Sequence, residues 1–201
     1  MGKKFELTEN YVVNEFGTKL YQIKCTKTFK YAKEGELGGY IEKEENLSQE
    51  CNAWVSGDAR VSDDARVSGD ARVFGDAQVS GDACVSGNAW VSGDAQVYDN
   101  ARVSDDALVS GNALVSDNAW VFGNARVSDN AEVLGNARVS DNAWVSGNAL
   151  VYDNAWVLGD ARVLGNARVY DNARVSGDAR VLGNAWVYDN ARVSGDARVC
   201  K

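Results

Sequence analysis

From Asn52 to Lys201 the chain repeats one six-residue unit, and this repeat restricts its possible folds more than any other feature. The unit reads [N/D]-A-x-V-y-[G/D] and occurs 25 times without an insertion, with Lys201 in the last position of the final copy. Ala and Val stand two residues apart, so in an extended strand both face one way while slots x and y face the other. Gly, Asp and Asn tolerate left-handed backbone conformations. Each hexad therefore predicts a short strand followed by a corner.

The larger copy in the sequence sets the length of the coil. Residues 163–180 and 181–198 are identical except that Trp186 replaces Arg168, so the copied block is three hexads, or 18 residues, long. A strand-and-corner unit cannot bury its apolar side alone, whereas stacked coils can. We therefore predict an all-β fold, a triangular parallel β-helix of about eight coils whose core is filled by Val and Ala. The same spacing relates the tyrosines of the four VYDN segments, Tyr98, Tyr152, Tyr170 and Tyr188.

The first 51 residues depart from the repeat and are typical of a cap. Residues 5–13 and 19–31 alternate like β-strands and are separated by the turn residues Asn14–Gly17. Farther along, Ile41 and Leu47 stand 12 and 6 residues before Ala53, which places both in the Ala register.

Three parts of the chain follow from these patterns. We expect an N-terminal β-rich cap over residues 1–39, two degenerate capping hexads over residues 40–51, and the hexapeptide-repeat β-helix over residues 52–201. The repeat runs to Val199 without a second cap. Because an uncovered strand edge leaves backbone groups unpaired, we expect another copy of the chain to pair there. A frayed last coil or a shortened chain is the alternative.

The hexads resemble the hexapeptide repeat of left-handed parallel β-helices, in which a small residue follows an aliphatic one four positions later, as Ala59 follows Val55. The segment LGGYIEKEENLSQECNAWV, residues 37–55, resembles the one that leads into the solenoid of YdcK-type proteins of bacterial and prophage genomes. The resemblance implies a left-handed coil, and the transferase label of such proteins rests on the repeat alone. Cys51 stands where the pattern favours Gly or Asp, which leaves the first corner in doubt.

The absence of histidine argues against catalysis. Hexapeptide-repeat acyltransferases use a histidine as general base, and γ-class carbonic anhydrases hold zinc with three histidines. The chain has no histidine, and no hexad carries an inserted loop. We therefore expect no enzymatic activity, no cofactor and no metal site, with a degenerate acyltransferase as an alternative. Cys84 is a lone thiol in slot x, which favours a surface residue over a nucleophile.

Composition excludes several further classes. The net charge of −8 disfavours direct binding to nucleic acid. The first residues lack the apolar run of a secretory signal, and no stretch approaches 18 apolar residues, so we expect neither a signal peptide nor a membrane-spanning helix. The four cysteines lack paired or metal-like spacing, so we expect reduced thiols and a cytoplasmic protein. Stacked acidic corners also allow a prophage-type nucleic-acid mimic that acts on a DNA-binding or defence protein.

Acidic side chains recur along one corner of the predicted prism. Neighbouring coils would hold these carboxylates about 5 Å apart, which raises carboxyl pKa values or attracts cations. Asp is also a good corner former, and we favour that simpler role. The residues are Asp99, Asp117, Asp153, Asp171 and Asp189.

Because the Val, Ala and corner residues are needed for the fold, we expect a specific function to depend on the outward side chains of slots x and y. Slot x holds all six Trp, each with an Arg 18 residues away, which predicts cation–π contacts. Tyr, Trp and Arg are enriched at interfaces, and monomers seldom expose large apolar patches. Ladders that only stabilise the sheet are the alternative. We call one such strip the aromatic face: Leu134, Leu150, Tyr152, Arg168, Tyr170, Trp186 and Tyr188.

The sequence therefore predicts a non-catalytic interaction solenoid. We expect it to form a homo-oligomer, or to bind a protein partner, through the aromatic face and the open C-terminal end.

Overall fold

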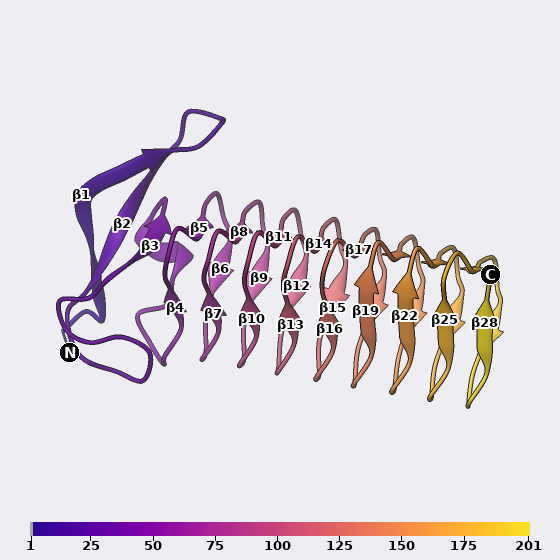
Figure 1. The fold of residues 1–201 in the computed structure, drawn as a ribbon. Coiled ribbons are helices and arrows are strands. Elements are labelled where there is room, and N and C mark those ends of the chain that lie inside the picture. The colour runs from indigo at the N-terminus through magenta and orange to yellow at the C-terminus, as the bar shows by residue number, and fades with distance from the viewer. Residues whose placement is uncertain (1) are drawn as a thin grey trace.

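The computed structural model describes residues 2–201 and shows an all-β parallel solenoid. Each turn takes 18 residues, and about nine turns follow one another along a single axis (Figure 1). The predicted β-solenoid and its 18-residue coil are confirmed, while the left-handed sense of the coil stays a prediction. The ninth turn comes from the segment before residue 52, which adds strand β3 to the stack.

Three sheets run the length of the prism, and from β4 onward each strand pairs with the strand three positions later in the chain. Sheet A contains β1 (Phe5–Val13), β2 (Lys19–Cys25), β3 (Leu37–Ile41), β5 (Arg60–Val61), β8 (Gln78–Val79), β11 (Gln96–Val97), β14 (Leu114–Val115), β17 (Glu132–Val133), β20 (Leu150–Val151), β23 (Arg168–Val169) and β26 (Trp186–Val187). Sheet B contains β6 (Arg66–Val67), β9 (Cys84–Val85), β12 (Arg102–Val103), β15 (Trp120–Val121), β18 (Arg138–Val139), β21 (Trp156–Val157), β24 (Arg174–Val175) and β27 (Arg192–Val193). Sheet C contains β4 (Trp54–Val55), β7 (Arg72–Val73), β10 (Trp90–Val91), β13 (Leu108–Val109), β16 (Arg126–Val127), β19 (Trp144–Gly147), β22 (Arg162–Gly165), β25 (Arg180–Leu182) and β28 (Arg198–Cys200).

The core consists of the Ala and Val side chains of the hexads. From Ala53 to Val187 these side chains are at most 3% exposed. Burying one Val side chain stabilises the fold by roughly 1.5–3 kcal/mol before chain entropy is subtracted. In the last two hexads, residues 190–201, both Ala are exposed and both Val half-buried, because no further coil lies over them in this structure.

The corners require a left-handed backbone, and Gly or Asp supplies it. The nine Asp residues in the last position of a hexad have φ between 56° and 62°, a region that Asp tolerates better than most residues. Six of these carboxylates reach forward by one coil: Asp117, for example, accepts a hydrogen bond from the Gly135 N–H at 2.9 Å, and Asp171 accepts one from the Asp189 N–H at 3.0 Å. Cys51 has φ of 55° and so forms the first corner in spite of its side chain.

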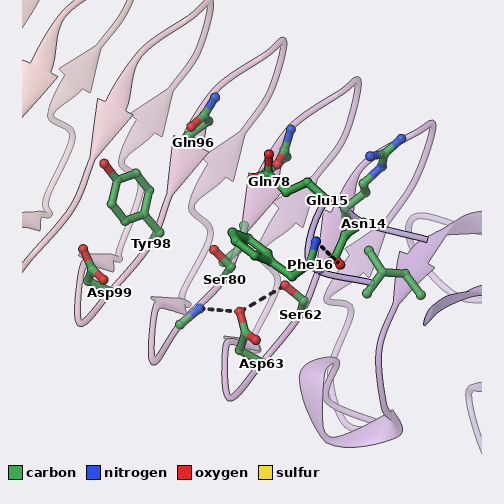
Figure 2. A pocket seen from close by; sticks show the side chains of 14 residues that line it. Asn14, Glu15, Phe16, Ser62, Asp63, Gln78, Ser80, Gln96, Tyr98 and Asp99 are labelled. Atoms are coloured by element: carbon green, nitrogen blue, oxygen red, sulfur yellow. Dashed lines mark hydrogen bonds between the residues drawn. The ribbon is translucent and has the colours of Figure 1, made fainter. Parts of the chain in front are cut away.

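The cap begins with an antiparallel hairpin of β1 and β2. Strand β3 pairs antiparallel with β2 and parallel with β5, so sheet A runs without a break from the hairpin into the solenoid. The tip of the hairpin, residues 14–18, overhangs the first coils of sheet A (Figure 2). The predicted strand over residues 19–31 is too long: β2 ends at Cys25, whose carbonyl oxygen accepts from the Gly35 N–H as the chain turns back.

The register predicted for the capping hexads is wrong. Ile41 pairs with Val61 and Leu47 pairs with Val67, so both occupy Val positions and not Ala positions. The spacing of six between Ile41 and Leu47 is kept, but the corner between Leu47 and Val55 contains two extra residues. A 3-10 helix, η1 (Glu44–Asn46), fills the corner between the two positions.

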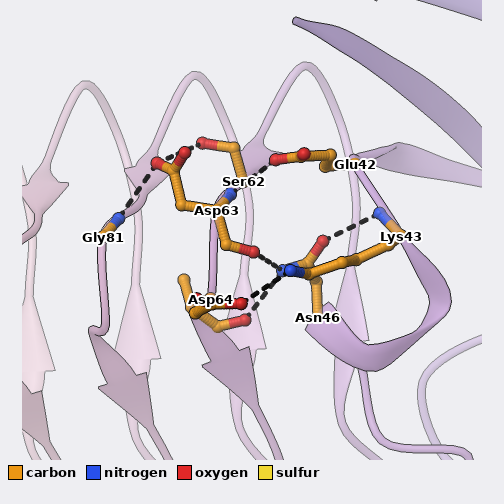
Figure 3. Close-up of polar contacts among 8 residues, drawn as sticks. Glu42, Lys43, Asn46, Ser62, Asp63, Asp64 and Gly81 are labelled. Carbon is orange, nitrogen blue, oxygen red and sulfur yellow. Dashed lines mark hydrogen bonds and ion pairs between the residues drawn. The ribbon is translucent and has the colours of Figure 1, made fainter.

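Side chains of the cap satisfy the carbonyl groups at the start of the solenoid. The Asn46 amide donates to the Asp63 and Ala65 carbonyl oxygens at 3.0 and 2.9 Å (Figure 3). Lys4, only 1% exposed, donates through its ammonium group to the Ala53 carbonyl oxygen at 2.8 Å and to that of Glu50 at 3.4 Å. Buried side-chain donors of the cap thus form the hydrogen bonds that the backbone N–H groups of a preceding coil would otherwise donate.

Replacing Lys4 with Met tests this cap, because Met keeps the apolar stem and removes both donated hydrogen bonds. We expect the free energy of unfolding to fall by about 1–3 kcal/mol, since two carbonyl groups lose their partner. Lys3→Met is the matched control: the Lys3 ion pair with Glu44 is exposed, so its loss should cost at most about 1 kcal/mol. Equal effects of the two substitutions in urea unfolding would contradict the capping role.

The same pair of variants gives a pH test. Burial lowers the pKa of Lys4 from 10.5 to about 8. Between these values the unfolded chain binds a proton that the folded chain has lost, so stability rises with pH. Wild-type protein and Lys3→Met should gain stability through this window relative to Lys4→Met. Parallel stability curves for all three proteins would show that the folded Lys4 titrates normally.

Candidate interaction surface

The structure brings the residues of the aromatic face together on sheet A, over strands β17, β20, β23 and β26. Three phenol rings form a continuous stack on this face. The Tyr152 and Tyr170 ring centroids are 4.8 Å apart with an interplanar angle of 4°, and those of Tyr170 and Tyr188 are 5.4 Å apart with an angle of 13°. In-register coils place equal residues above one another, which is why the rings meet face to face.

Exposure on the aromatic face increases toward the C-terminal end. Trp186 is 56% exposed and Tyr188 47%, whereas Tyr152 and Tyr170 are half-buried by their neighbours in the stack. The Arg168 guanidinium lies 5.5 Å from the centroid of the Trp186 ring and holds that ring by a cation–π contact. Leu134 and Leu150 are half-buried at the other end of the strip.

Tyr152 and Tyr170 remain neutral near pH 7. Partial burial is the main cause that raises the pKa of Tyr152 and of Tyr170 above the ordinary value of 10. The phenol groups can therefore donate hydrogen bonds while their rings present apolar area, a combination that is common at interfaces.

The two borders of the aromatic face differ in charge. Along the corner between sheets C and A, asparagine amides donate to one another from coil to coil, as Asn148 does to Asn166 at 3.0 Å and Asn166 to Asn184 at 3.0 Å. The opposite corner carries Asp153 and Asp171 in left-handed conformations. One border is thus neutral and the other acidic.

Two leucines extend this apolar surface and were not predicted as part of it. Leu164 and Leu182 are half-buried in slot y of sheet C, directly before the asparagine corner. Their signal is present in the sequence, because slot y before this corner is Ser in most coils. A pattern along one face does not reveal which residues of the next face lie beside it across a corner.

Cation–π contacts form for five of the six Trp. Arg138, for example, lies 5.8 Å from the Trp120 ring and 5.1 Å from the Trp156 ring. Trp54 is the exception among the described residues: it is buried in the core and packs edge-on against Phe29 at 5.5 Å. The cap covers the first coil of sheet C, which the hexad pattern could not indicate.

Within residues 2–201, no three His, Cys, Asp or Glu side chains are grouped as metal ligands would be. Nor does any helix in this part of the chain reach the length and apolar character needed to cross a membrane.

Cys84 is half-buried between Arg66 and Arg102 in the ladder of sheet B.

Comparison with solved structures finds two sugar-nucleotide acyltransferases at a TM-score of 0.34 each. The UDP-N-acetylglucosamine acyltransferase of Francisella novicida is 12% identical over 64% of this chain and 58% of its own. The enzyme of Campylobacter jejuni is 14% identical over 74% of this chain and 65% of its own. The chain spans less than two thirds of the length of either enzyme.

Sequence comparison identifies the repeat. No curated protein matches the chain. A family model described as the YdcK beta solenoid repeat matches segments throughout the solenoid, namely residues 65–79, 77–93, 95–111, 143–159, 167–183, 173–189 and 185–201. The chain is therefore a β-solenoid that carries the YdcK beta solenoid repeat in these segments.

Proposed function

We propose that this chain is a non-catalytic interaction solenoid that associates with a second copy of itself through the aromatic face. The observation that supports this most is the Tyr152–Tyr170–Tyr188 stack, which ends at the exposed ring of Tyr188; Trp186 on the same strip is exposed as well. Aromatic side chains held by their neighbours lose little conformational entropy on binding. The exposed last coil, residues 184–201, is the second contact that we propose.

The charge of the two borders favours one arrangement of the copies. Two flat faces can pack about 10 Å apart, as sheets do in a sandwich. If the twofold axis lies along the solenoid axis, the acidic border of one copy meets the asparagine border of the other. A twofold axis parallel to the strands, perpendicular to the solenoid axis, would place Asp171 near its own equivalent. We therefore propose parallel solenoids, in which amide donors face carboxylates.

The non-catalytic part of the proposal rests on the lack of histidine anywhere in the chain. A calorimetric titration with acetyl-CoA tests it directly. We expect no heat of binding, and saturable binding would support the degenerate acyltransferase instead.

Substitution of two rings of the aromatic face tests the self-association. We expect wild-type protein to have the mass of a dimer in light scattering after size exclusion, and Tyr170→Ser combined with Trp186→Ser to give a monomer. The control is Tyr98→Ser combined with Trp144→Ser, which removes the same two residue types away from the aromatic face. A wild-type monomer whose mass does not change in either double variant would refute the proposed interface. Capture of an unlike protein through the same residues would favour a hetero-complex.

A second experiment separates binding from stabilisation by the ladder. Tyr170→Ala removes two ring stacks, which we expect to lower the free energy of unfolding by about 1–3 kcal/mol more than Tyr98→Ala does. Tyr98 is the matched control, because it occupies the same slot of sheet A between Ser80 and Ser116. Urea unfolding followed by circular dichroism gives both values. If Tyr170→Ala destabilises the fold but leaves the dimer intact, the tyrosine stack stabilises sheet A and does not contribute to self-association.

A further inference from the structure

A cleft of about 540 Å³ lies between the hairpin tip and the first coils of sheet A. Its floor is formed by strands β5, β8 and β11, and its wall by residues 14–16 (Figure 2). The aromatic face occupies the same sheet but begins two coils farther on, at Leu134. The cleft is therefore a separate site, and the sequence pattern did not indicate it.

The floor of the cleft presents two columns of polar side chains. Within each column, successive residues lie one coil apart. One column consists of Arg60, Gln78 and Gln96, which pair as neighbours in sheet A. The second column consists of the slot y residues that follow, ending in Tyr98. Gln78 and Gln96 are exposed, and neither side-chain amide has a hydrogen-bond partner within residues 2–201. Each amide offers an acceptor and two donors to a ligand.

The wall adds an aromatic ring that has no role in the core. Phe16 is 85% exposed at the hairpin tip. The Asn14 side-chain oxygen accepts hydrogen bonds from the N–H groups of Phe16 and Thr18 at 3.0 and 2.9 Å, and Gly17 has φ of 83°. The turn thus fixes the position from which the ring projects beside the polar columns.

The charges of the cleft disfavour an anionic ligand. Glu15, Asp63 and Asp99 line it against the single cation Arg60. The Asp63 carboxylate already accepts a hydrogen bond from the Gly81 N–H at 3.1 Å. An extended peptide cannot add to the floor as a strand, because β8 is paired on both sides. A neutral ligand that binds through side chains remains.

We propose that this cleft binds a neutral oligosaccharide. Amide groups can donate to one sugar hydroxyl and accept from its neighbour, and the exposed ring of Phe16 can pack against the C–H face of a pyranose. The rise between coils, about 4.8 Å, is close to the advance of one pyranose unit in an extended β-linked glycan, so successive columns can meet successive sugars. Binding sites of this kind combine a concave surface with a few convergent polar groups.

The test uses NMR spectra of the full chain labelled with nitrogen-15. The probes are cellotetraose, chitotetraose and maltotetraose at millimolar concentration, with trigalacturonate as the anionic comparison and a neutral Gly/Ser/Asn peptide as the alternative occupant. We expect at least one neutral glycan to shift the side-chain amide signals of Gln78 and Gln96, and trigalacturonate to leave them unchanged.

Variants decide whether such shifts report this cleft. Gln78→Ala combined with Gln96→Ala, and separately Phe16→Ala, should each weaken binding by about tenfold, which corresponds to the loss of about 1.4 kcal/mol of binding free energy. Glu132→Ala is the matched control, because it lies in the same slot of sheet A outside the cleft, and it should bind normally. The proposal is overturned if no neutral glycan shifts the Gln signals, if both cleft variants bind as wild type does, or if only the peptide binds.

Discussion

The backbone hydrogen bonds between successive coils are the constraint on which the rest of this structure depends. The N–H of Trp120 donates to the Ala137 carbonyl oxygen at 2.9 Å, and equivalent bonds recur in each coil at a sequence distance of 17 residues. These bonds fix the register at 18 residues for all three sheets. Every outward side chain therefore lies directly over the residue 18 positions earlier. Even when the core positions are filled by Val and Ala, each outward side chain must also be compatible with the side chain that lies over it in the next coil.

Each residue type resolves this stacking in its own way. An asparagine amide is self-complementary, so Asn148 can accept from Asn130 and donate to Asn166. Phenol rings gain contact when stacked in parallel. Like-charged residues gain nothing from one another, and the corner Asp carboxylates bind backbone N–H groups of the next coil. On sheet B, Arg and Trp alternate from Arg102 to Arg174, so that Arg138 contacts a ring on either side. An outer slot can therefore hold many residue types, but the types that occupy the same slot in neighbouring coils must be compatible with one another.

The degree to which the sequence predicts the structure follows from this periodicity. The solenoid, its coil length and its buried Val and Ala could be predicted, because one local rule repeats without interruption. The wrong register of Ile41 and Leu47 and the burial of Trp54 depend on contacts between the cap and the first coils, and those contacts have no period. The cleft was missed for the same reason, since Phe16 and Gln78 are 62 residues apart in sequence and meet only through the hairpin. The aromatic face was found because its members share the 18-residue spacing.

The two candidate sites divide sheet A between them. Near the cap, slots x and y hold Gln and Ser, and the overhanging hairpin turns a flat sheet into a cleft. Toward the C-terminus the same slots hold Leu, Tyr and Trp, and nothing in residues 2–201 covers them. The backbone and the core are alike in both regions, so the difference lies only in side chains that the fold does not need. Two flat faces that pack together would exclude an overhanging loop, whereas a cleft requires one. The position of the hairpin therefore restricts a self-associating surface to the coils that it does not reach, which is where the aromatic residues lie.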